Sequence, residues 1–330
     1  MAGQTILLTR QDIAAHFDPL AAVAALERAM GEFERGADYL PPKAIYDVPL
    51  PELGAWAVCL AGMTQASGLL TMKLGQERTH NPTRQLPTTS SWITVFDPVT
   101  GELLMICDGT LPTMMRTAAA AAVAAKHLAR PDSRVLAVIG AGQLGRQCAR
   151  IVRHACPFSE ILLHDDSART AREAAESLAS TVNIPVRVVD ARSACARADV
   201  IVTATNSRKP VILSEWVRTG THLSCMGSDL PEKIECDMQL LPRCRLFADK
   251  VDHATARGEV SQAVAAGVLS QECFAGSLGQ VINGDVPGRT HRDQITLFDG
   301  VGIGIQDTTI ARTLLDQAHT RGLGTRICFS

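Results

Sequence analysis

The chain contains no uncharged apolar run of about 18 residues, the length that a membrane-spanning helix requires, so the sequence predicts no such helix. It has no surplus of basic residues, since 32 lysines and arginines stand against 34 aspartates and glutamates, and this balance does not indicate nucleic-acid binding. Its first residues lack the charged start and long apolar core of a secretory signal. We therefore expect a cytoplasmic protein with no nucleic-acid or membrane partner.

The ten cysteines also lack the spacing of a metal site, with no C-x-x-C pair and no histidine close enough to complete one. The histidines, including His80 and His222, show no metal-ligand spacing either. In a chain with no secretory signal, scattered cysteines are typical of buried, reduced thiols. The sequence therefore predicts no bound metal.

The chain does contain enough residues for two domains: it has 330, of which 46% are hydrophobic, as is typical of a globular enzyme. The first hundred or so residues combine a helix at 19–35 with several short strands. An alanine-rich helix at 116–129 follows, and strands and helices then alternate, which predicts a doubly wound parallel sheet. The pattern changes again before a final helix at 305–321. We place domain boundaries near residues 125 and 295.

The most informative motif follows a predicted buried strand at 135–139, where Gly140, Gly142 and Gly145 have the G-x-G-x-x-G spacing. Gly140 permits a tight turn, Gly142 lets the backbone approach a pyrophosphate, and Gly145 lets the next helix pack close to the strand. The diphosphate of a dinucleotide would then lie at the helix N-terminus, where N–H groups and the helix dipole favour anions. The alternative is an ordinary strand–turn–helix, because the glycine spacing alone is a weak signal.

A second apolar strand, 160–164, is followed by Asp165. An acidic side chain at this point accepts hydrogen bonds from both ribose hydroxyls and repels a 2′-phosphate, so it favours NAD over NADP. The nearby Arg169 complicates this preference. The alternative is that Asp165 is a turn residue that caps the helix starting near Ala168. We predict NAD(H) as the cofactor.

Several blocks of the sequence resemble the ornithine cyclodeaminase/mu-crystallin family. They occur in the family's order over almost the whole chain, and together they are far more specific than the glycine motif. The blocks are Lys73, Arg116–Ala119, Gly140–Gly142, Ala198–Thr205, Gly227–Glu235, Gly258–Glu259 and the segment from Ile295 through Asp307.

The resemblance implies the fold class: α/β, with a Rossmann-type doubly wound parallel sheet plus a strand-rich α/β substrate and dimerisation domain. It assigns residues 1–125 and 296–330 to the substrate-binding and dimerisation domain. It assigns residues 126–295 to the dinucleotide-binding domain, with NAD(H) favoured over NADP(H). It also implies a homodimer whose strand-rich domains meet at the interface, which would explain the many short strands of the first region.

The family's shared chemistry is hydride transfer between nicotinamide and the α-carbon of an amino acid, through an imine. The resemblance implies an imine or ketimine reductase or an L-amino-acid dehydrogenase such as alanine dehydrogenase, acting on a small amino acid, 2-oxo acid or cyclic imine. One alternative is an ornithine or lysine cyclodeaminase, which recycles its NAD internally and releases ammonia. Another is a ligand-binding protein in the manner of mu-crystallin, although binding alone has no use for a proton-transfer group.

A free amino acid presents a carboxylate, which needs cationic partners. Arg116 and Lys73 match the family positions that bind it; arginine offers a planar fork of donors and lysine a point charge. Without the resemblance, Lys73 would be an unremarkable lysine at a strand end, and Arg116 a helix N-terminal residue in a surface ion pair.

Asp229 matches the family's catalytic aspartate, and we predict that it exchanges a proton with the substrate nitrogen. It follows a strand that ends near Gly227, at the carboxyl end of the sheet, where ligands bind in open α/β folds. The alternative is a turn residue before Leu230 and Pro231.

Lys43 follows Pro41 and Pro42. The resemblance implies a catalytic role, because the family's alanine dehydrogenases have a lysine in this context and ornithine cyclodeaminases an arginine. Its ammonium can polarise a carbonyl or stabilise the carbinolamine during imine hydrolysis. The alternative is an exposed loop lysine.

Cyclodeaminases of the family also need an acidic residue to receive the second amino group of the substrate. Alignment with the family pattern places Cys59 at that point, and Ala61-Gly62 departs from the usual Met-Pro. A diamino substrate would lose a charged hydrogen bond, a penalty of up to about a hundredfold. This argues against ornithine cyclodeamination.

Glu259 and Asp307 are expected to line or support the substrate pocket; the alternatives are solvated side chains or side chains that act one contact away from the substrate. The predicted cofactor-binding residues are Gly140, Ala141, Gly142, Gln143, Leu144, Gly145, Asp165, Thr203, Ala204 and Thr205.

Overall fold

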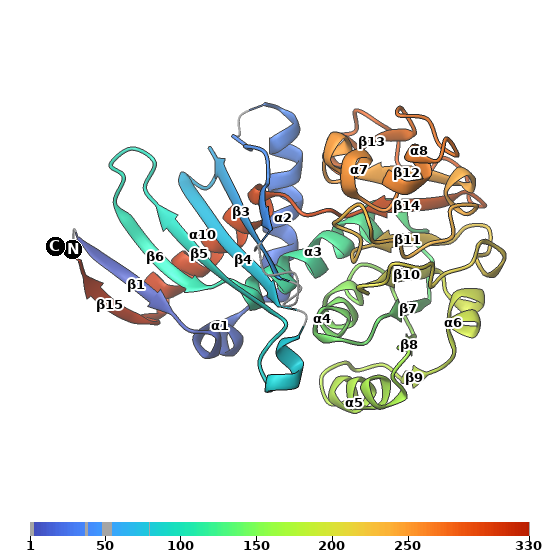
Figure 1. Cartoon of the computed structure of the whole chain (residues 1–330), viewed down its shortest axis with the longest axis horizontal. Coiled ribbons are helices and arrows are strands. Elements are labelled where there is room, and N and C mark those ends of the chain that lie inside the picture. Colours follow the sequence, from blue (N-terminus) through green and yellow to red (C-terminus); the bar gives the residue numbers. More distant parts are fainter. Residues whose placement is uncertain (1–2, 37–38, 48–54, 79, 330) are drawn as a thin grey trace. The chain divides into compact units, whose positions relative to one another are not determined.

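The computed structural model describes residues 3–36, 39–47, 55–78 and 80–329. The chain divides into two compact units, Met1–Arg116 with Ile303–Ser330, and Thr117–Gly302. The first unit is built on a mostly antiparallel sheet and the second on a parallel one (Figure 1). The predicted combination of a strand-rich region with a parallel sheet is therefore confirmed.

Seven strands form the sheet of the first unit, in the order β15-β1-β6-β5-β4-β3-β2. Neighbouring strands are antiparallel, except that β1 and β6 are parallel. Their bounds are β1 Gln4–Leu8, β2 Ala44–Asp47, β3 Ala55–Thr64, β4 Leu69–Arg78, β5 Thr89–Phe96, β6 Leu103–Asp108 and β15 Thr325–Cys328.

Helix α10 covers one face of this sheet, contacting β3, β4 and β5 and packing against α2. Helix α2 begins where it does because Asp18 accepts hydrogen bonds from two backbone N–H groups of the first turn and Pro19 is the first helical residue. Helix α10 ends at Gly322, which has a left-handed φ of 68°. The helical elements of this unit are α1 Arg10–His16, α2 Pro19–Glu34, the short 3-10 helix η2 Asn81–Arg84 and α10 Gly304–Arg321.

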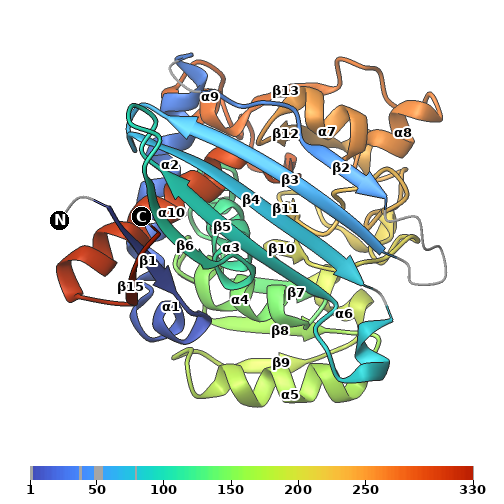
Figure 2. The same ribbon diagram turned by 60° about the vertical axis from the view of Figure 1, so that its left-hand side comes forward.

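The two faces of the sheet differ in burial because side chains alternate along each strand. In β4, Thr71 and Lys73 are buried on the face that α10 covers, and the hydroxyl of Thr71 lies 2.6 Å from that of Thr308 in α10. The opposite face, here named the outer face, is turned toward the viewer in Figure 2. Its large apolar side chains are exposed by 44–58%: Tyr46, Met72, Leu74 and Trp92.

Helix α3, Thr110–Leu128, runs from the first unit into the second. It begins six residues before Arg116, where the sequence pattern placed its start. Pro112 falls in the first turn, where the missing N–H costs nothing, so the helix can start ahead of it. The alanines from Ala118 to Ala125 are almost fully buried.

Eight strands form the sheet of the second unit, in the order β13-β12-β14-β11-β10-β7-β8-β9, and every neighbouring pair is parallel. The predicted parallel sheet is therefore confirmed. The bounds are β7 Val135–Ile139, β8 Glu160–His164, β9 Val186–Val188, β10 Val200–Thr203, β11 His222–Cys225, β12 Cys244–Ala248, β13 Phe274–Ser277 and β14 Ile295–Asp299.

The chain enters this sheet at β7, adds β8 and β9 on one side, and then returns to add β10 and β11 on the other. The direction of strand addition therefore reverses between β7 and β10, which is the point where open α/β sheets bind ligands. The helical elements are α4 Gln143–Val152, α5 Ala168–Ala179, α6 Ala191–Arg197, η3 Ser214–Trp216, η4 Leu241–Arg243, α7 Val251–Arg257, α8 Ser261–Ala265 and α9 Leu278–Asn283.

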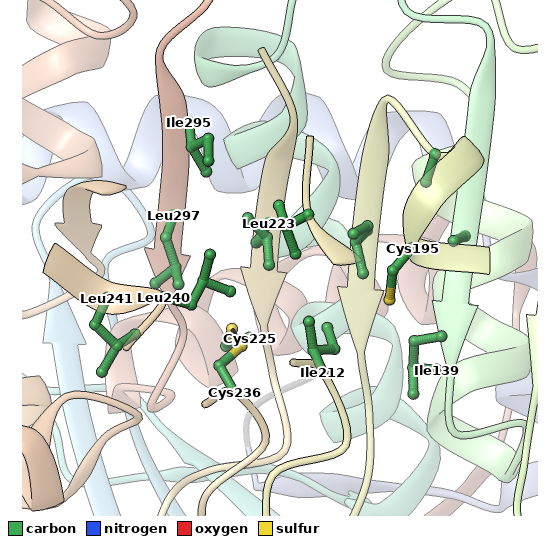
Figure 3. Close-up of a cluster of buried hydrophobic side chains, with 14 of the residues drawn as sticks. Ile139, Cys195, Ile212, Leu223, Cys225, Cys236, Leu240, Leu241, Ile295 and Leu297 are labelled. Atoms are coloured by element: carbon green, nitrogen blue, oxygen red, sulfur yellow. Dashed lines mark hydrogen bonds between the residues drawn. The ribbon is translucent and has the colours of Figure 1, made fainter. Parts of the chain in front are cut away.

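A cluster of buried side chains fixes the layers of this unit (Figure 3). Leu223 and Cys225 of β11 lie beside Leu297 of β14, and all three are completely buried. Burial of each large apolar side chain contributes about 1.5–3 kcal/mol, so the strand ends are held by a rigid core. Within the described parts of the chain, no helix is long and apolar enough to cross a membrane.

Candidate functional site

The glycine loop after β7 has the geometry that a dinucleotide requires. Gly140 has a φ of 95°, which disfavours other residues, and a Cβ atom at Gly145 would lie 1.8 Å from the carbonyl oxygen of Gly140. Gly142 caps the N-terminus of α4 with no side-chain hydrogen bond, and a Cβ atom there would meet nothing within 4 Å. The loop thus offers an open backbone surface at a helix N-terminus, where phosphates bind.

Asp165 follows β8 and is tied to this loop. Its Oδ2 accepts a hydrogen bond from the N–H of Ala141 (2.9 Å), and its Oδ1 accepts one from the N–H of Ser167 (2.9 Å). The cap of α5 is Ser167, not Asp165, so the capping alternative does not describe this residue. Arg169 forms an ion pair with Glu173 at 2.8 Å, so its guanidinium already has a carboxylate partner.

The three residues predicted to bind cofactor at the end of β10 are placed differently from one another. Thr203 is completely buried, and its hydroxyl donates to Glu235 Oε2 at 2.6 Å. Ala204 and Thr205 are half-buried, and the N–H and hydroxyl of Thr205 both donate to Glu235 Oε1. The side chain of Thr203 therefore faces the interior and supports the strand end.

Asp229 lies just beyond β11, at the same carboxyl edge of the sheet as the glycine loop. Its Oδ1 accepts a hydrogen bond from Lys233 Nζ at 2.8 Å, and its side chain is 36% exposed, whereas that of Lys233 is 11% exposed. Nζ of Lys233 also lies 3.4 Å from Asn206 Oδ1. The carboxylate that we predict to transfer protons is therefore held by an ammonium four residues along the chain.

In the first unit, Lys73 and Asp307 form a buried ion pair. Nζ of Lys73 lies 2.8 Å from Oδ1 and 2.7 Å from Oδ2 of Asp307, and both side chains are at most 5% exposed. Lys73 is therefore not a solvated lysine at a strand end.

Arg116 joins this pair from α3. Its Nε lies 3.4 Å from Asp307 Oδ1, and its Nη1 donates to Gln306 Oε1 at 2.9 Å. The residue is 8% exposed and lies inside the helix, so the surface ion pair considered for it is not what the fold forms. Lys73 and Arg116 carry two positive charges and Asp307 one negative charge, so the three side chains together are cationic.

Burial lowers the pKa of Lys73 to about 8, although Asp307 opposes this effect. The positive charges of Arg116 and Lys43 lower it further, so Lys43 belongs to the same electrostatic cluster. Burial acts to raise the pKa of Asp307, but the charges of Lys73 and Arg116 outweigh it and hold that pKa below its usual range. The structure thus brings together Lys73, Arg116 and Asp307, and the charge of Lys43 acts on both Lys73 and Asp307.

Cys59, which the alignment placed at the position of the cyclodeaminase acid, lies on the face of β3 opposite to that of Lys73. Leu60 is directly opposite Lys73 in the pairing of β3 with β4, and it is 7% exposed on the same face. Cys59 is opposite Leu74 and lies on the outer face. A shift of one residue moves a side chain to the other face of a sheet, which the alignment alone could not detect. The side chain that faces Lys73 is nevertheless apolar, as the argument against a diamino substrate requires.

Glu259 is completely buried in the second unit, where its carboxylate accepts hydrogen bonds from the N–H groups of Glu235 and Cys236. It supports the segment that follows Asp229. In the described residues, no three His, Cys, Asp or Glu side chains form a group that could hold a metal ion.

Sequence reasoning missed Gln306, Lys233, Leu60 and Glu235 as contact residues. Lys233 had a detectable signal, since it stands four residues after Asp229 on the same short segment. Gln306 and Leu60 had none in the local pattern, because each is defined by a partner distant in the sequence.

The sheet order, the glycine loop and its acidic partner define a Rossmann-type dinucleotide-binding protein. The chain belongs to the ornithine cyclodeaminase/mu-crystallin family, whose model matches residues 4–322. It is 32% identical over 326 residues to alanine dehydrogenase of Archaeoglobus fulgidus, covering 99% of both chains. It is 31% identical over 322 residues to iminosuccinate reductase of Paracoccus denitrificans, covering 98% of this chain and 99% of that one.

Solved structures agree with this assignment. An archaeal alanine dehydrogenase dimer with bound NAD matches with a TM-score of 0.93 and 30% identity, covering 99% of this chain and 100% of that one. The Δ1-pyrroline-2-carboxylate reductase of Thermococcus litoralis, in complex with NADH and L-proline, matches at 0.94 and 28%, covering 98% and 100%. A lysine cyclodeaminase matches at 0.86 and 28%, covering 99% and 96%.

Proposed function

We propose that this protein is an NAD(H)-dependent oxidoreductase that acts on the C–N bond at the α-carbon of an amino acid or its imine. An imine or ketimine reductase and an L-amino-acid dehydrogenase are the two forms of this activity. The family membership and the relatives named above support the proposal.

The observation that carries the proposal is the buried cationic cluster of the first unit. In the part of the chain that the structure describes, Lys73 and Arg116 are paired in the interior with one carboxylate, that of Asp307. Burying a second positive charge costs several kcal/mol unless an anion compensates it. The carboxylate of an amino or imino acid supplies the missing negative charge, so we assign Lys73 and Arg116 to substrate binding.

Asp229 is the proposed proton-transfer group. When bound, NADH supplies a hydride to the α-carbon of the substrate imine. Asp229 exchanges the proton on the substrate nitrogen, and Lys43 assists the interconversion of carbonyl and imine. The electrostatic coupling of Lys43 to Lys73 and Asp307 supports this placement of Lys43.

NAD(H) fits the second unit. The open backbone at Gly142 and the N-terminus of α4 suit the diphosphate, and Gln143 and Leu144 begin that helix. Asp165 suits a ribose with two free hydroxyls, because a carboxylate repels the 2′-phosphate of NADP. The relatives with bound NAD or NADH support the same choice.

The main alternative is a cyclodeaminase, which would release ammonia from ornithine or lysine with no net change in NAD. Leu60 counts against it, since it places an alkyl group opposite Lys73 where a second amino group would need a carboxylate. The similarity to the solved lysine cyclodeaminase is the observation that favours this alternative.

We also propose a homodimer that forms through the outer face of the first sheet. Tyr46, Met72, Leu74 and Trp92 expose large apolar surfaces there, and Leu74 is paired directly with Trp92. The archaeal alanine dehydrogenase is described as a dimer, which supports this proposal.

A cytoplasmic location stays a prediction. All ten cysteines fall in the described residues and are free thiols.

The deciding experiment is an NADH-absorbance assay with a panel of 2-oxo acids plus ammonia or methylamine, and of cyclic ketimines. Consumption of NADH with one substrate supports the proposal and names the substrate class. Ammonia release from ornithine or lysine at constant NAD would instead establish the cyclodeaminase.

The matching variant is Asp229→Asn. It should lower kcat by about 100-fold or more, the usual contribution of a general acid–base group, and should leave NADH binding intact. Near-normal turnover in this variant would refute the assigned role of Asp229.

A further inference from the structure

Glu235 is completely buried and uses both carboxylate oxygens fully. Its Oε1 accepts hydrogen bonds from the N–H of Thr205 (2.7 Å) and from the hydroxyl of Thr205 (2.8 Å). Its Oε2 accepts from the hydroxyl of Thr203 (2.6 Å) and from the N–H of Gly227 (2.8 Å). Four hydrogen bonds to one carboxylate need a specific geometry of all the donors.

These donors belong to two different strand ends. Thr203 ends β10 and Thr205 follows it, whereas Gly227 follows β11 and precedes Asp229 by two residues. The two strands are neighbours in the sheet. A single side chain therefore joins a predicted cofactor-binding segment to the segment that carries the predicted proton-transfer residue.

The backbone packing at this edge leaves no room for adjustment. A Cβ atom at Gly227 would lie 2.2 Å from the carbonyl oxygen of Thr205 and 2.5 Å from Glu235 Oε1. A Cβ atom at Gly140 would lie 2.5 Å from the carbonyl oxygen of Ala204. The glycine loop, the end of β10 and the end of β11 thus touch backbone to backbone, so a shift in one is passed to the next.

The far side of Glu235 is also fixed. Glu259 accepts hydrogen bonds from the N–H groups of Glu235 and Cys236, at 3.0 and 2.6 Å. The thiol of Cys236 lies 3.6 Å from that of Cys225 at the end of β11, and Figure 3 shows the two side by side. Burial raises the pKa of Glu235, while its hydrogen-bond donors act to lower it.

We infer that Glu235 is a positioning residue for the reaction: it holds the segment of Thr205 and the segment of Asp229 in one fixed relation. This inference rests on the proposed function, because it gives Glu235 its effect through Asp229 and the cofactor-binding segment. A displacement of about 1 Å at a reacting group can reduce a rate by about a hundredfold, so a hydrogen-bonding residue behind the site can control turnover.

The first test is Glu235→Gln, which keeps the shape of the side chain. An amide has one oxygen and one NH2 group, so either orientation places the NH2 against the N–H of Thr205 or of Gly227, and one strand end is released. We expect kcat to fall by about 100-fold and the Kd for NADH, measured by fluorescence titration, to rise by about tenfold. Unchanged values of both quantities would overturn the inference.

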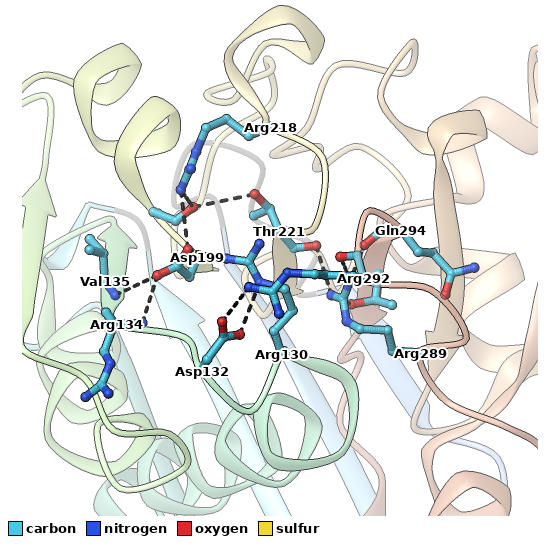
Figure 4. Close-up of polar contacts among 12 residues, drawn as sticks. Arg130, Asp132, Arg134, Val135, Asp199, Arg218, Thr221, Arg289, Arg292 and Gln294 are labelled. Carbon is cyan, nitrogen blue, oxygen red and sulfur yellow. Dashed lines mark hydrogen bonds and ion pairs between the residues drawn. The ribbon is translucent and has the colours of Figure 1, made fainter.

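The matched control is Asp199→Asn. Asp199 directly precedes β10, so it lies at the end of that strand opposite to Thr203, and Figure 4 shows its contacts. Asp199 is also buried and accepts hydrogen bonds from two backbone N–H groups, those of Arg134 and Val135, and from the guanidinium of Arg130. Asp199→Asn should lower Tm without changing kcat or the Kd for NADH at 25 °C. An equal loss of kcat in Asp199→Asn would show that any destabilisation of the sheet produces the effect, which would overturn the inference.

A milder pair protects the test if Glu235→Gln does not fold. Thr203→Val removes one hydroxyl donor at nearly constant volume, whereas Thr203→Ser keeps the donor. We expect kcat to fall by about tenfold in Thr203→Val and to stay within about twofold of wild type in Thr203→Ser. Equal rates in the two variants would contradict the role of this hydrogen bond.

A double-mutant cycle separates positioning from stability. If Glu235 acts through Asp229, then Glu235→Gln should reduce kcat little further in an Asp229→Asn background, while the rise in the Kd for NADH persists. Additive losses of kcat would overturn the inference. If Asp229→Asn alone keeps its turnover, the assigned role of Asp229 fails, and the NADH titration still decides whether Glu235 fixes the cofactor-binding segment.

Discussion

The ammonium of Lys73 lies 2.7 and 2.8 Å from the two carboxylate oxygens of Asp307, a residue 234 positions further along the chain. Both side chains are buried, and Arg116 approaches the same carboxylate at 3.4 Å. Because a buried charge is stable only with a partner, we expect this relationship to control the stability of the first unit and, under the proposed function, the charge that it offers to a substrate.

Removal of the carboxylate should therefore destabilise the protein. We expect Asp307→Asn to lower the free energy of unfolding by about 3–5 kcal/mol at neutral pH, because Arg116 then keeps its buried charge without this carboxylate and Lys73 loses the partner that holds its pKa up. The measurement is urea unfolding. Asp316→Asn is the control on the same helix, since Asp316 forms an exposed pair with Arg312, and it should cost no more than about 1 kcal/mol. Equal losses in the two variants would contradict the importance of the buried pair.

Substrate binding should depend on the protonation of Lys73. Its pKa is lowered to about 8, so the ammonium loses its proton, and its attraction for a carboxylate, as the pH rises through that value. We expect kcat/KM for an anionic substrate to fall by about tenfold or more between about pH 8 and about pH 10. Lys73→Arg keeps its charge over this range and should abolish the fall. The same decline in wild type and Lys73→Arg would assign it to another group.

The glycine loop provides a pair of variants that separate binding from folding. Gly142→Ala adds a methyl group in open space at a φ of −65°, so Tm should stay near the wild-type value. Its Kd for NADH should rise by about tenfold, because the cofactor needs close approach to this backbone. Gly145→Ala should instead cost about 1–3 kcal/mol or more of stability, since its Cβ would overlap the carbonyl of Gly140. An unchanged Kd for NADH in Gly142→Ala would contradict the proposal that the diphosphate binds at this loop.

Strand alternation predicts which residue of β3 controls the substrate. Leu60→Glu would place a carboxylate opposite Lys73, so the ratio of kcat/KM for ornithine to that for a simple 2-oxo or imino acid should rise by about tenfold. Cys59→Glu lies on the outer face and should leave this ratio unchanged. If the kcat/KM ratio rises in Cys59→Glu but not in Leu60→Glu, then Cys59, and not Leu60, faces the substrate.

Self-association should depend on the outer face. Trp92→Glu introduces a charge beside Leu74 and should convert a dimer into a monomer in sedimentation-velocity experiments, because a charge in an apolar interface is not compensated. Val99 is the control, since it is 91% exposed in the turn after β5, and Val99→Glu should leave the dimer intact. A Trp92→Glu protein that remains dimeric would place the interface on another surface.

Much of the second unit was predictable because its signals are local. The apolar strand at 135–139, the three glycines and the next strand ending before Asp165 lie within about thirty residues, and each has a backbone reason for its position. The regular alternation of strands and helices then fixes a parallel sheet, since parallel neighbours require crossover connections.

The boundaries of helices were less predictable at proline, which is tolerated in the first turn of a helix but breaks the interior. Helix α3 can start at Thr110, two residues before Pro112, because its first turn does not use the N–H group that proline lacks.

By itself, the sequence determined the parallel sheet, the glycine loop and the family to which the chain belongs, because these depend on short-range pattern and on residue type. Only the tertiary structure decided which face of β3 carries Leu60 and which carries Cys59, that Asp307 is the partner of Lys73 and Arg116, and that Glu235 joins two strand ends. The physical reason is that a buried polar group is defined by its partners. These partners lie at the ends of neighbouring strands or, for Asp307, more than 190 residues away, where no local pattern records them.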